Sequence, residues 1–232
     1  MTQFDPESAG QRNVKGPPPA AMIRKQLAQA RILAVRLIGH PGSGKTQLID
    51  ATLRRLPAPQ RVAVIVVNPA SSRDADRLLG LCGFVGHIDA AAPDAASILR
   101  IMSQLQLEKF DVLLIETAGG LGTLPDLGQD ATVAVFAVSG GDDKAAEYSG
   151  LLNSASAIVL TKTDLHAMVK FDDGVFRRDV KNINPSAEIL ALSAVSGDGM
   201  PSWLAWLDRK RIDKRSRDAD AGAAHFKEYF IG

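Results

Sequence analysis

The stretch Gly39-His40-Pro41-Gly42-Ser43-Gly44-Lys45-Thr46 fits the pattern G-x-x-x-x-G-K-[ST]. An apolar run over residues 32–38 precedes it, and a predicted helix over residues 47–56 follows it. A strand, a glycine-rich loop and a helix in this order place backbone N–H groups and the positive end of a helix dipole around phosphate oxygens. The predicted phosphate-binding residues are Gly39, Gly42, Ser43, Gly44, Lys45, Thr46 and Gln47.

Three side chains are predicted to carry the phosphate chemistry. Lys45 is expected to contact the β- and γ-phosphates, and the Thr46 hydroxyl is expected to bind Mg²⁺. Glu116 ends a strand-like run and would face the phosphate loop, where it can hold Mg²⁺ or its water. Gly119 follows Glu116 at the spacing of a γ-phosphate sensor.

A second segment indicates which base the nucleotide carries. Thr161-Lys162-Thr163-Asp164 resembles the [NT]-K-x-D element of GTPases, in which the Asp accepts hydrogen bonds from guanine and the Lys stem packs on the base. Ser193-Ala194 resembles the GTPase element that touches the guanine oxygen through its backbone. The alternative is an ATP-dependent small-molecule kinase, in which Asp164 and Ser193 are ordinary residues at strand ends.

The rest of the chain alternates short apolar runs with amphipathic segments. Strands are expected at 32–38, 61–67, 84–88, 112–116, 132–139, 157–161 and 188–193. Helices are expected at 20–30, 47–56, 73–81, 93–105, 174–181 and 201–206. This alternation predicts an α/β fold with a doubly wound, mostly parallel sheet.

Composition narrows the class of protein. The 232 residues carry a net charge of +1, which gives no reason to expect nucleic acid or an acidic membrane as the main partner. One cysteine, Cys82, excludes an internal disulfide and a multi-cysteine metal site within one chain. No apolar run approaches the roughly 20 residues of a membrane span. The first residues lack the features of a signal peptide, so a cytoplasmic protein is expected.

Three parts are predicted along the chain: a disordered leader over 1–19, a nucleotide-binding domain over 20–208 and an extension over 209–232. The extension begins with a basic cluster and ends with an apolar group. It is expected to form a solvated helix whose end docks on the core, since runs of charge usually face solvent. The alternative is a tail that binds a partner.

Several stretches resemble the GTPases that insert nickel during hydrogenase and urease maturation, the HypB and UreG types. The hydrogenase branch is closer, because its E-N-V-G…D-L-G signature is similar to Glu116-Thr117-Ala118-Gly119…Asp126-Leu127-Gly128. The resemblance covers residues 20–208. Its other segments are Asp142-Asp143-Lys144 with Tyr148, residues 161–165, residues 184–189, Leu192-Ser193-Ala194, Gly197-Asp198-Gly199 and residues 203–207.

The resemblance implies a P-loop NTPase of the signal-recognition-particle and MinD class. It implies GTP hydrolysis to GDP and phosphate, with Mg²⁺, in a homodimer that GTP favours, and a metalloenzyme or maturation-factor client. The family lysine that matches Lys144 lies near the nucleotide and reaches across the dimer.

The sequence departs from this family at its metal sites. The family Asp after the second strand is Asn68 here, so slow hydrolysis or a role for the nearby Asp74 is expected. The family Cys-His pair falls on Asp94-Ala95, and a second family cysteine falls near Thr123.

Cys82 and His87 remain as possible ligands. Two copies of each, across a dimer axis, could bind Ni²⁺ or Zn²⁺. The simpler and favoured interpretation is a buried structural cysteine beside an ordinary loop histidine. His40 is expected to be a surface substitution in the phosphate loop rather than a catalytic base. Two protein classes stay open beside the GTPase that assists metal-centre assembly: a true nickel chaperone, and a metal-free GTP switch with a protein client.

Overall fold

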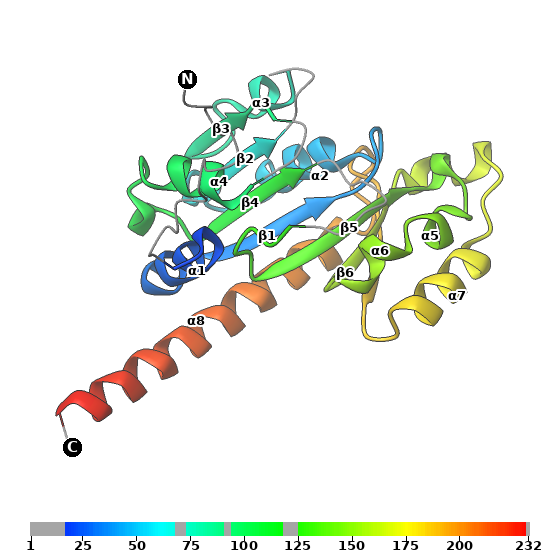
Figure 1. Cartoon of the computed structure of the whole chain (residues 1–232). Coiled ribbons are helices and arrows are strands. Elements are labelled where there is room, and N and C mark those ends of the chain that lie inside the picture. The colour runs from blue at the N-terminus through cyan, green and yellow to red at the C-terminus, as the bar shows by residue number, and fades with distance from the viewer. Residues whose placement is uncertain (1–16, 68–72, 91–93, 118–124, 231–232) are drawn as a thin grey trace, which may run out of the picture.

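The computed structural model describes residues 17–67, 73–90, 94–117 and 125–230. Within these residues, seven parallel strands form one sheet in the order β3-β2-β4-β1-β5-β6-β7 (Figure 1). The strands are β1 (Leu33–Ile38), β2 (Val62–Val67), β3 (Phe84–Ile88), β4 (Val112–Thr117), β5 (Ala131–Ala137), β6 (Ala157–Thr161) and β7 (Glu188–Ala191). The prediction of a doubly wound parallel sheet is confirmed.

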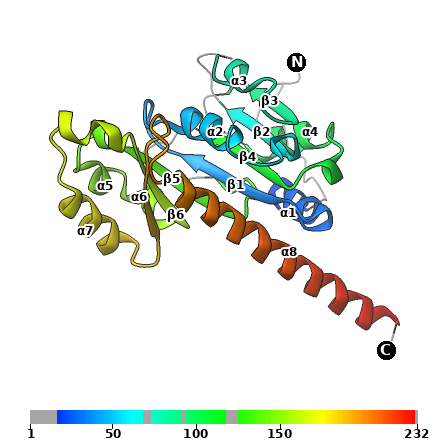
Figure 2. The same cartoon turned by 180° about the vertical axis from the view of Figure 1, so that it is seen from behind.

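Helices cover both faces of the sheet (Figures 1 and 2). Those on one face are α2 (Lys45–Leu53), α3 (Arg73–Leu78) and α8 (Met200–Phe230). Those on the other are α1 (Pro19–Ala30), α4 (Ala95–Met102), α5 (Lys144–Glu147), α6 (Ser149–Asn153) and α7 (Asp173–Ile183). Short 3₁₀ helices lie at η2 (Pro59–Arg61), η3 (Leu107–Lys109), η4 (Val138–Gly140) and η5 (Thr163–Met168).

The central strands are mostly apolar because both of their faces are covered. In β1, Leu33, Val35 and Leu37 pack toward α2 and α8, and the alternate residues pack toward the opposite layer. On the α2 side, Trp203 stacks on Trp206 with ring centroids 5.3 Å apart. The indole N–H of Trp203 donates to the Thr52 hydroxyl at 2.8 Å, which fixes the start of α8 against α2.

Some predicted elements differ from the structure. Two short helices, α5 and α6, were not predicted, because segments of four and five residues carry too little periodicity to be recognised. Helix α4 is shorter than the predicted 93–105: it begins at Ala95, where the Asp94 carboxylate accepts a hydrogen bond from the Ser97 backbone N–H at 2.8 Å. Pro93 lies outside the described residues.

Helix α8 crosses the predicted domain boundary at residue 208 without a break. Its 31 residues would span about 46 Å at 1.5 Å per residue. Its C-terminal end points away from the sheet in both views, so the prediction that this end docks on the core is wrong (Figures 1 and 2). Nearly all of the predicted leader, residues 1–16, lies outside the described residues. In the described part of the chain, no helix is long and apolar enough to cross a membrane.

Candidate functional site

A cavity of about 480 Å³ opens at the carboxyl edge of the sheet, where β1, β2, β4 and β6 end. Ligands of open α/β sheets bind at this edge, because the strand-to-helix loops converge there. The cavity is lined by the phosphate loop and by residues of four other segments: Pro41, Gly42, Gly44, Lys45, Thr46, Gln47, Val66, Val67, Asp74, Arg77, Glu116 and Lys162. Side chains far apart in sequence therefore meet at one place.

The phosphate loop is held tightly against the sheet. A Cβ atom on Gly39 would lie 2.3 Å from the Val135 carbonyl oxygen, so no other residue fits there without movement of β5. Gly44 has φ +90°, a conformation that residues with a Cβ rarely adopt, and it forms the N-cap of α2. The two glycines thus let the loop turn from β1 into α2 with its first N–H groups free for an anion.

Lys45 folds over this loop. Its ammonium group donates to the backbone oxygens of Gly39 at 2.9 Å and His40 at 3.1 Å. The side chain is buried, and this burial lowers the pKa of Lys45, while the charges of Glu116 and Asp74 raise it. A buried cation whose hydrogen-bond partners are neutral carbonyls can exchange them for phosphate oxygens.

Thr46 and Glu116 contact each other across the cavity. The Thr46 hydroxyl donates to Glu116 Oε1 at 2.7 Å, while Glu116 Oε2 is buried and has no hydrogen-bond partner among the described residues. Burial raises the pKa of Glu116 above its usual range, and the Thr46 hydrogen bond and the Lys45 charge oppose that shift. Because a hydroxyl and an unpartnered carboxylate oxygen are hard oxygen ligands, this pair fits Mg²⁺.

Helix α3 adds a second carboxylate and a cation, since Asp74 and Arg77 both line the cavity. Asp74 is close enough to influence the pKa values of both Lys45 and Glu116. The sequence singled out Asp74 only as a neighbour of Asn68. Asn68, Gly119 and Thr123 lie outside the described residues.

The predicted base-recognition segment adjoins the phosphate loop. The Thr161 hydroxyl lies 2.7 Å from the Ser43 backbone oxygen and 3.0 Å from that of Phe136, and its single O–H is shared between these two acceptors. Lys162 adopts φ +59°, an uncommon left-handed conformation for a residue other than glycine, and its side chain lines the cavity. Asp164 follows in η5 and is exposed.

Thr161 is a residue to which the sequence analysis gave no role of its own. Its signal was its place as the first residue of the [NT]-K-x-D element. Only the fold shows that its hydroxyl joins the base-recognition segment to the phosphate loop.

Ser193 and Ala194 form a turn beside this segment. The Thr163 backbone N–H donates to the Leu192 oxygen at 3.3 Å, which links the two predicted base-recognition loops. The fully buried Ser193 hydroxyl accepts hydrogen bonds from the N–H groups of Val195 and Ser196, at 3.2 and 3.0 Å. Ser193 therefore shapes the turn with its side chain, and the half-buried Ala194 lies within that turn.

His40 contacts the segment that contains Lys144. It is half-buried, and its ring lies 6.1 Å from that of Tyr148. Lys144 forms an ion pair with Glu147 and lies 6.0 Å from the centre of the Tyr148 ring. The Asp142 carboxylate accepts a hydrogen bond from the Asp172 N–H at 2.9 Å. Within one chain, these contacts connect the phosphate loop with the α5 region.

Cys82 and His87 lie near opposite ends of the edge strand β3. Since a strand rises about 3.3 Å per residue, His87 is about 10 Å along β3 from Phe84, while Cys82 precedes the strand. The Cys82 thiol donates to the Phe84 oxygen at 3.2 Å, and burial raises its pKa. Among the described residues, no group of three or more His, Cys, Asp or Glu side chains is placed to hold a metal.

Comparisons with known proteins identify relatives of this chain. A family model described as "CobW/HypB/UreG, nucleotide-binding domain" matches residues 33–191. Hydrogenase maturation factor HypB of Escherichia coli strain K12 is 34% identical over 194 residues, covering 81% of this chain and 67% of that protein. The chain thus spans about two thirds of the length of that relative.

Two solved structures share the fold. HypB of Archaeoglobus fulgidus superposes with a TM-score of 0.76 at 28% identity, covering 83% of this chain and 97% of that one. HypB of Helicobacter pylori, solved in complex with nickel, gives a TM-score of 0.78 at 24% identity, covering 85% and 95%. The resemblance stated from the sequence motifs is confirmed.

Proposed function

The chain belongs to the CobW/HypB/UreG family, and from that premise we propose that it is a GTP-hydrolysing accessory protein that assists metal-centre assembly in another enzyme. One observation carries the proposal. The cavity brings Lys45, the Thr46–Glu116 pair and Lys162 together from three separate strand ends. The predicted phosphate-binding and base-recognition segments thus both contribute residues to one cavity.

The nucleotide phosphates would replace the present partners of Lys45. The ammonium would leave the Gly39 and His40 oxygens and neutralise charge on the β- and γ-phosphates, together with N–H groups at the start of α2. In hydrolysis, water attacks the γ-phosphorus while the bond to the bridging oxygen breaks, and the electron pair remains on GDP. Positioning and charge neutralisation are the chemistry these residues supply.

Thr46 and Glu116 would hold Mg²⁺, which supplies charge neutralisation on the β- and γ-phosphate oxygens when bound. Oε2 of Glu116, which has no hydrogen-bond partner among the described residues, would supply one of the ligand atoms. Asp74, on the α3 side of the cavity, would orient the attacking water in place of the family Asp that is absent at Asn68. Because Asn68 stands where the family has an Asp, we expect GTP hydrolysis to be slow.

Guanine would be selected by Asp164, which accepts hydrogen bonds from the base N1–H and 2-amino groups. Lys162 would pack its stem on the base, and the Ser193-Ala194 turn would lie at the guanine oxygen. We expect wild-type protein to bind GTP in preference to ATP and to hydrolyse it with Mg²⁺. Competition binding between the two nucleotides measures this preference.

Two variants of Asp164 test the guanine assignment sharply. Asp164→Ala should remove most of the GTP preference, since both hydrogen bonds to the base are lost. Asp164→Asn replaces an acceptor with an amide donor and should favour a xanthine nucleotide, which carries a carbonyl at the corresponding position. An unchanged preference for GTP over ATP in Asp164→Ala would overturn the assignment and leave the ATP-dependent kinase as the better hypothesis.

The nucleotide would also control pairing of two chains and contact with a client protein. This part of the proposal is supported by family membership and by the place of Lys144 next to Tyr148, on the segment linked to His40. Light scattering with GDP and with a non-hydrolysable GTP analogue tests it. A dimer with the analogue and a monomer with GDP is the expected result; the same state with both contradicts the proposed switch.

A second candidate is a metal-free GTP switch that binds a protein client. The positions of Cys82 before β3 and of His87 near its end favour it over a metal site within one chain, so that the site between two chains remains to be tested. Equilibrium binding of Ni²⁺ and Zn²⁺ to the reduced protein, with and without Mg-GTP, separates the candidates. About one metal per dimer, lost in Cys82→Ala, supports a nickel-handling protein. Binding that is absent or indifferent to Cys82 supports the switch.

A further inference from the structure

Arg36 is a fully buried arginine in the central strand β1. Arginine is almost never fully buried unless a carboxylate neutralises it. Within the described residues, none of the ion pairs includes Arg36. A buried guanidinium without an opposite charge beside it is energetically costly, so its presence in this strand calls for an explanation.

The partners of Arg36 are neutral oxygens. Its Nε–H donates to the Thr117 hydroxyl at 3.1 Å, and Nη1 donates to the Pro125 backbone oxygen at 2.8 Å. Nη2 is buried and has no hydrogen-bond partner among the described residues. Burial lowers the pKa of Arg36 to about 10, which still leaves it protonated at neutral pH.

These two hydrogen bonds join two separate parts of the chain. Thr117 is the last residue of β4 and follows Glu116 directly. The residues after Pro125 contact α1: Asp126 accepts a hydrogen bond from Arg24 at 2.6 Å, and Leu127 is buried in the same apolar cluster as Leu27. One guanidinium therefore ties the end of β4 to a segment anchored elsewhere in the domain.

The alternation of side chains along β4 connects the Arg36–Thr117 hydrogen bond to the candidate site. Successive side chains of a strand point to opposite faces of the sheet, so Thr117 and Glu116 face opposite ways. Thr117 faces Arg36 on the α1 side, and Glu116 faces Thr46 on the α2 side. A hydrogen bond that fixes Thr117 from one side therefore restricts the direction of the Glu116 carboxylate on the other.

We propose that Arg36 is a positioning residue that holds the end of β4 so that Glu116 meets Thr46 in the geometry needed for Mg²⁺-dependent GTP hydrolysis. The proposal rests on the function proposed above. Arg36 touches neither nucleotide nor metal in this scheme, and its effect is transmitted through Thr117. Removing it should therefore change the Mg²⁺ requirement and turnover more than nucleotide binding itself.

The test compares Arg36→Met, Arg36→Lys and Thr117→Val with the wild-type chain. For each protein, GTP affinity without Mg²⁺, kcat and the Mg²⁺ concentration for half-maximal hydrolysis are measured. In Arg36→Met, kcat should fall and the Mg²⁺ requirement should rise, each by about 10-fold, the lower end for loss of a group that orients a metal ligand. GTP affinity without Mg²⁺ should stay within about 2-fold of the wild-type value, since Arg36 makes no contact with the nucleotide in this scheme.

The two other variants separate charge from hydrogen bonding. Arg36→Lys keeps the charge but loses the planar fork that reaches both oxygens, so it should not restore the wild-type Mg²⁺ requirement. Thr117→Val keeps the shape of Thr117, removes the acceptor and should shift the Mg²⁺ requirement in the same direction. If Arg36→Met does not fold, Thr117→Val decides the proposal.

Leu27→Ala serves as the stability control, since Leu27 is buried in the apolar cluster on the same face of the sheet. It should lower Tm and leave the Mg²⁺ requirement unchanged. The proposal is overturned if Arg36→Met or Thr117→Val behaves like Leu27→Ala. A wild-type chain that neither binds nor hydrolyses GTP overturns the proposed function and this inference together, whereas active wild type with an insensitive Arg36 overturns the inference alone.

Discussion

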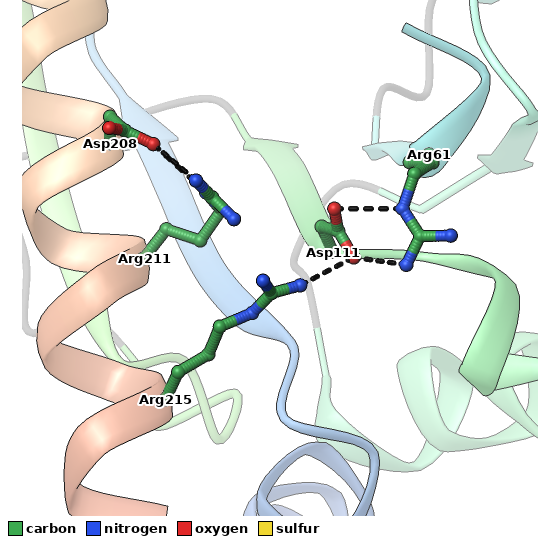
Figure 3. A network of polar contacts seen from close by, with 5 residues as sticks. All are labelled: Arg61, Asp111, Asp208, Arg211 and Arg215. Atoms are coloured by element: carbon green, nitrogen blue, oxygen red, sulfur yellow. Dashed lines mark hydrogen bonds and ion pairs between the residues drawn. The ribbon is translucent and has the colours of Figure 1, made fainter. Parts of the chain in front are cut away.

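The edge of the sheet at which the strands begin, the amino edge, differs from the edge at which they end, the carboxyl edge, in how its charged side chains are paired. At the amino edge, next to α8, Asp111 accepts hydrogen bonds from Arg61 Nε at 2.8 Å and Arg215 Nη2 at 2.7 Å (Figure 3). Nearby, the buried Lys214 pairs with Asp130 at 2.9 Å. Each of these charged groups has an opposite charge within hydrogen-bond distance.

At the carboxyl edge, the buried charges meet neutral partners instead. Lys45 is held by backbone oxygens, and Glu116 is held by the Thr46 hydroxyl, although both line one cavity. A neutral hydrogen-bond partner stabilises a buried charge less than an oppositely charged partner does. The comparison indicates that the amino edge is arranged for stability and the carboxyl edge for a ligand that brings the missing charges.

The largest expected effect is at Lys45. Lys45→Ala should weaken GTP binding by about 100-fold or more, because hydrogen bonds to charged groups contribute about 1.5–3 kcal/mol each and at least two are lost. Fluorescent GTP titration measures the change. Lys25→Ala, on the exposed side of α1, is the matched control and should bind normally. Normal GTP binding by Lys45→Ala would show that this loop does not bind phosphate.

Glu116→Gln should lower GTP hydrolysis by about 10- to 100-fold, since the proposed Mg²⁺ ligand is lost while the Thr46 hydrogen bond is kept. The same variant should raise the Tm of the nucleotide-free protein at pH 8 by about 2–4 °C, the shift that 1 kcal/mol gives in a chain of this length. Thermal unfolding and phosphate release measure the two effects. A lower rate of hydrolysis together with a higher Tm would support the view that the carboxyl edge is arranged for a ligand rather than for stability.

The stability effect of Glu116→Gln should depend on pH. The folded-state pKa of Glu116 is raised, mainly by burial, so ionisation of this carboxyl opposes folding. The protonated Glu116 carboxyl contributes to stability below the pKa of about 4.3 that it has in the unfolded chain. This contribution is lost as the pH rises through the pKa of Glu116 in the folded protein. The Tm difference between variant and wild type should therefore disappear at about pH 4. A difference that is constant from pH 4 to pH 8 contradicts this explanation.

Thr161→Val should have a smaller effect, on both GTP and ATP. The variant leaves the buried oxygens of Ser43 and Phe136 without this donor, at a cost of about 1 kcal/mol or more in stability. Because the phosphate loop shifts rather than the base contact, affinity for the two nucleotides should fall together. Competition binding distinguishes this from Asp164→Ala. A selective loss of GTP binding would place Thr161 in base recognition itself.

The smallest effect is expected at the amino edge. Asp111→Asn should lower Tm by about 2 °C and leave GTP binding unchanged, since its arginine partners are partly exposed and screened by solvent. The hydrogen bond with Arg61 is the main cause that holds the pKa of Asp111 below its usual range. Its contribution is therefore present above about pH 3.9 and is lost as the pH falls through the folded value. Weaker GTP binding in Asp111→Asn would show that the two edges are coupled.

Much of the fold and of the candidate site could be predicted from local sequence. The conformation of residues 39–46 could be predicted locally because their glycines permit the turn. The apolar run before them predicts the strand, and the helical pattern after them predicts the helix. The β-branched run of β2 and the exact extent of β3 were predicted for the same reason: periodicity and turn residues act over a few neighbours. Lys45 and Thr46 were predicted from their place in the glycine-rich motif at the start of α2, and Glu116 from its place at the end of β4.

The tertiary structure decided what depends on residues distant in sequence. It joined Thr161 to Ser43 and Arg36 to Thr117, placed Asp74 in the cavity, and separated Cys82 from His87 along β3. It also carried α8 past the core, against the prediction from its composition. Hydrogen bonds between distant segments and the direction of a long helix depend on how strands and helices pack, which the local pattern of apolar and polar residues does not specify.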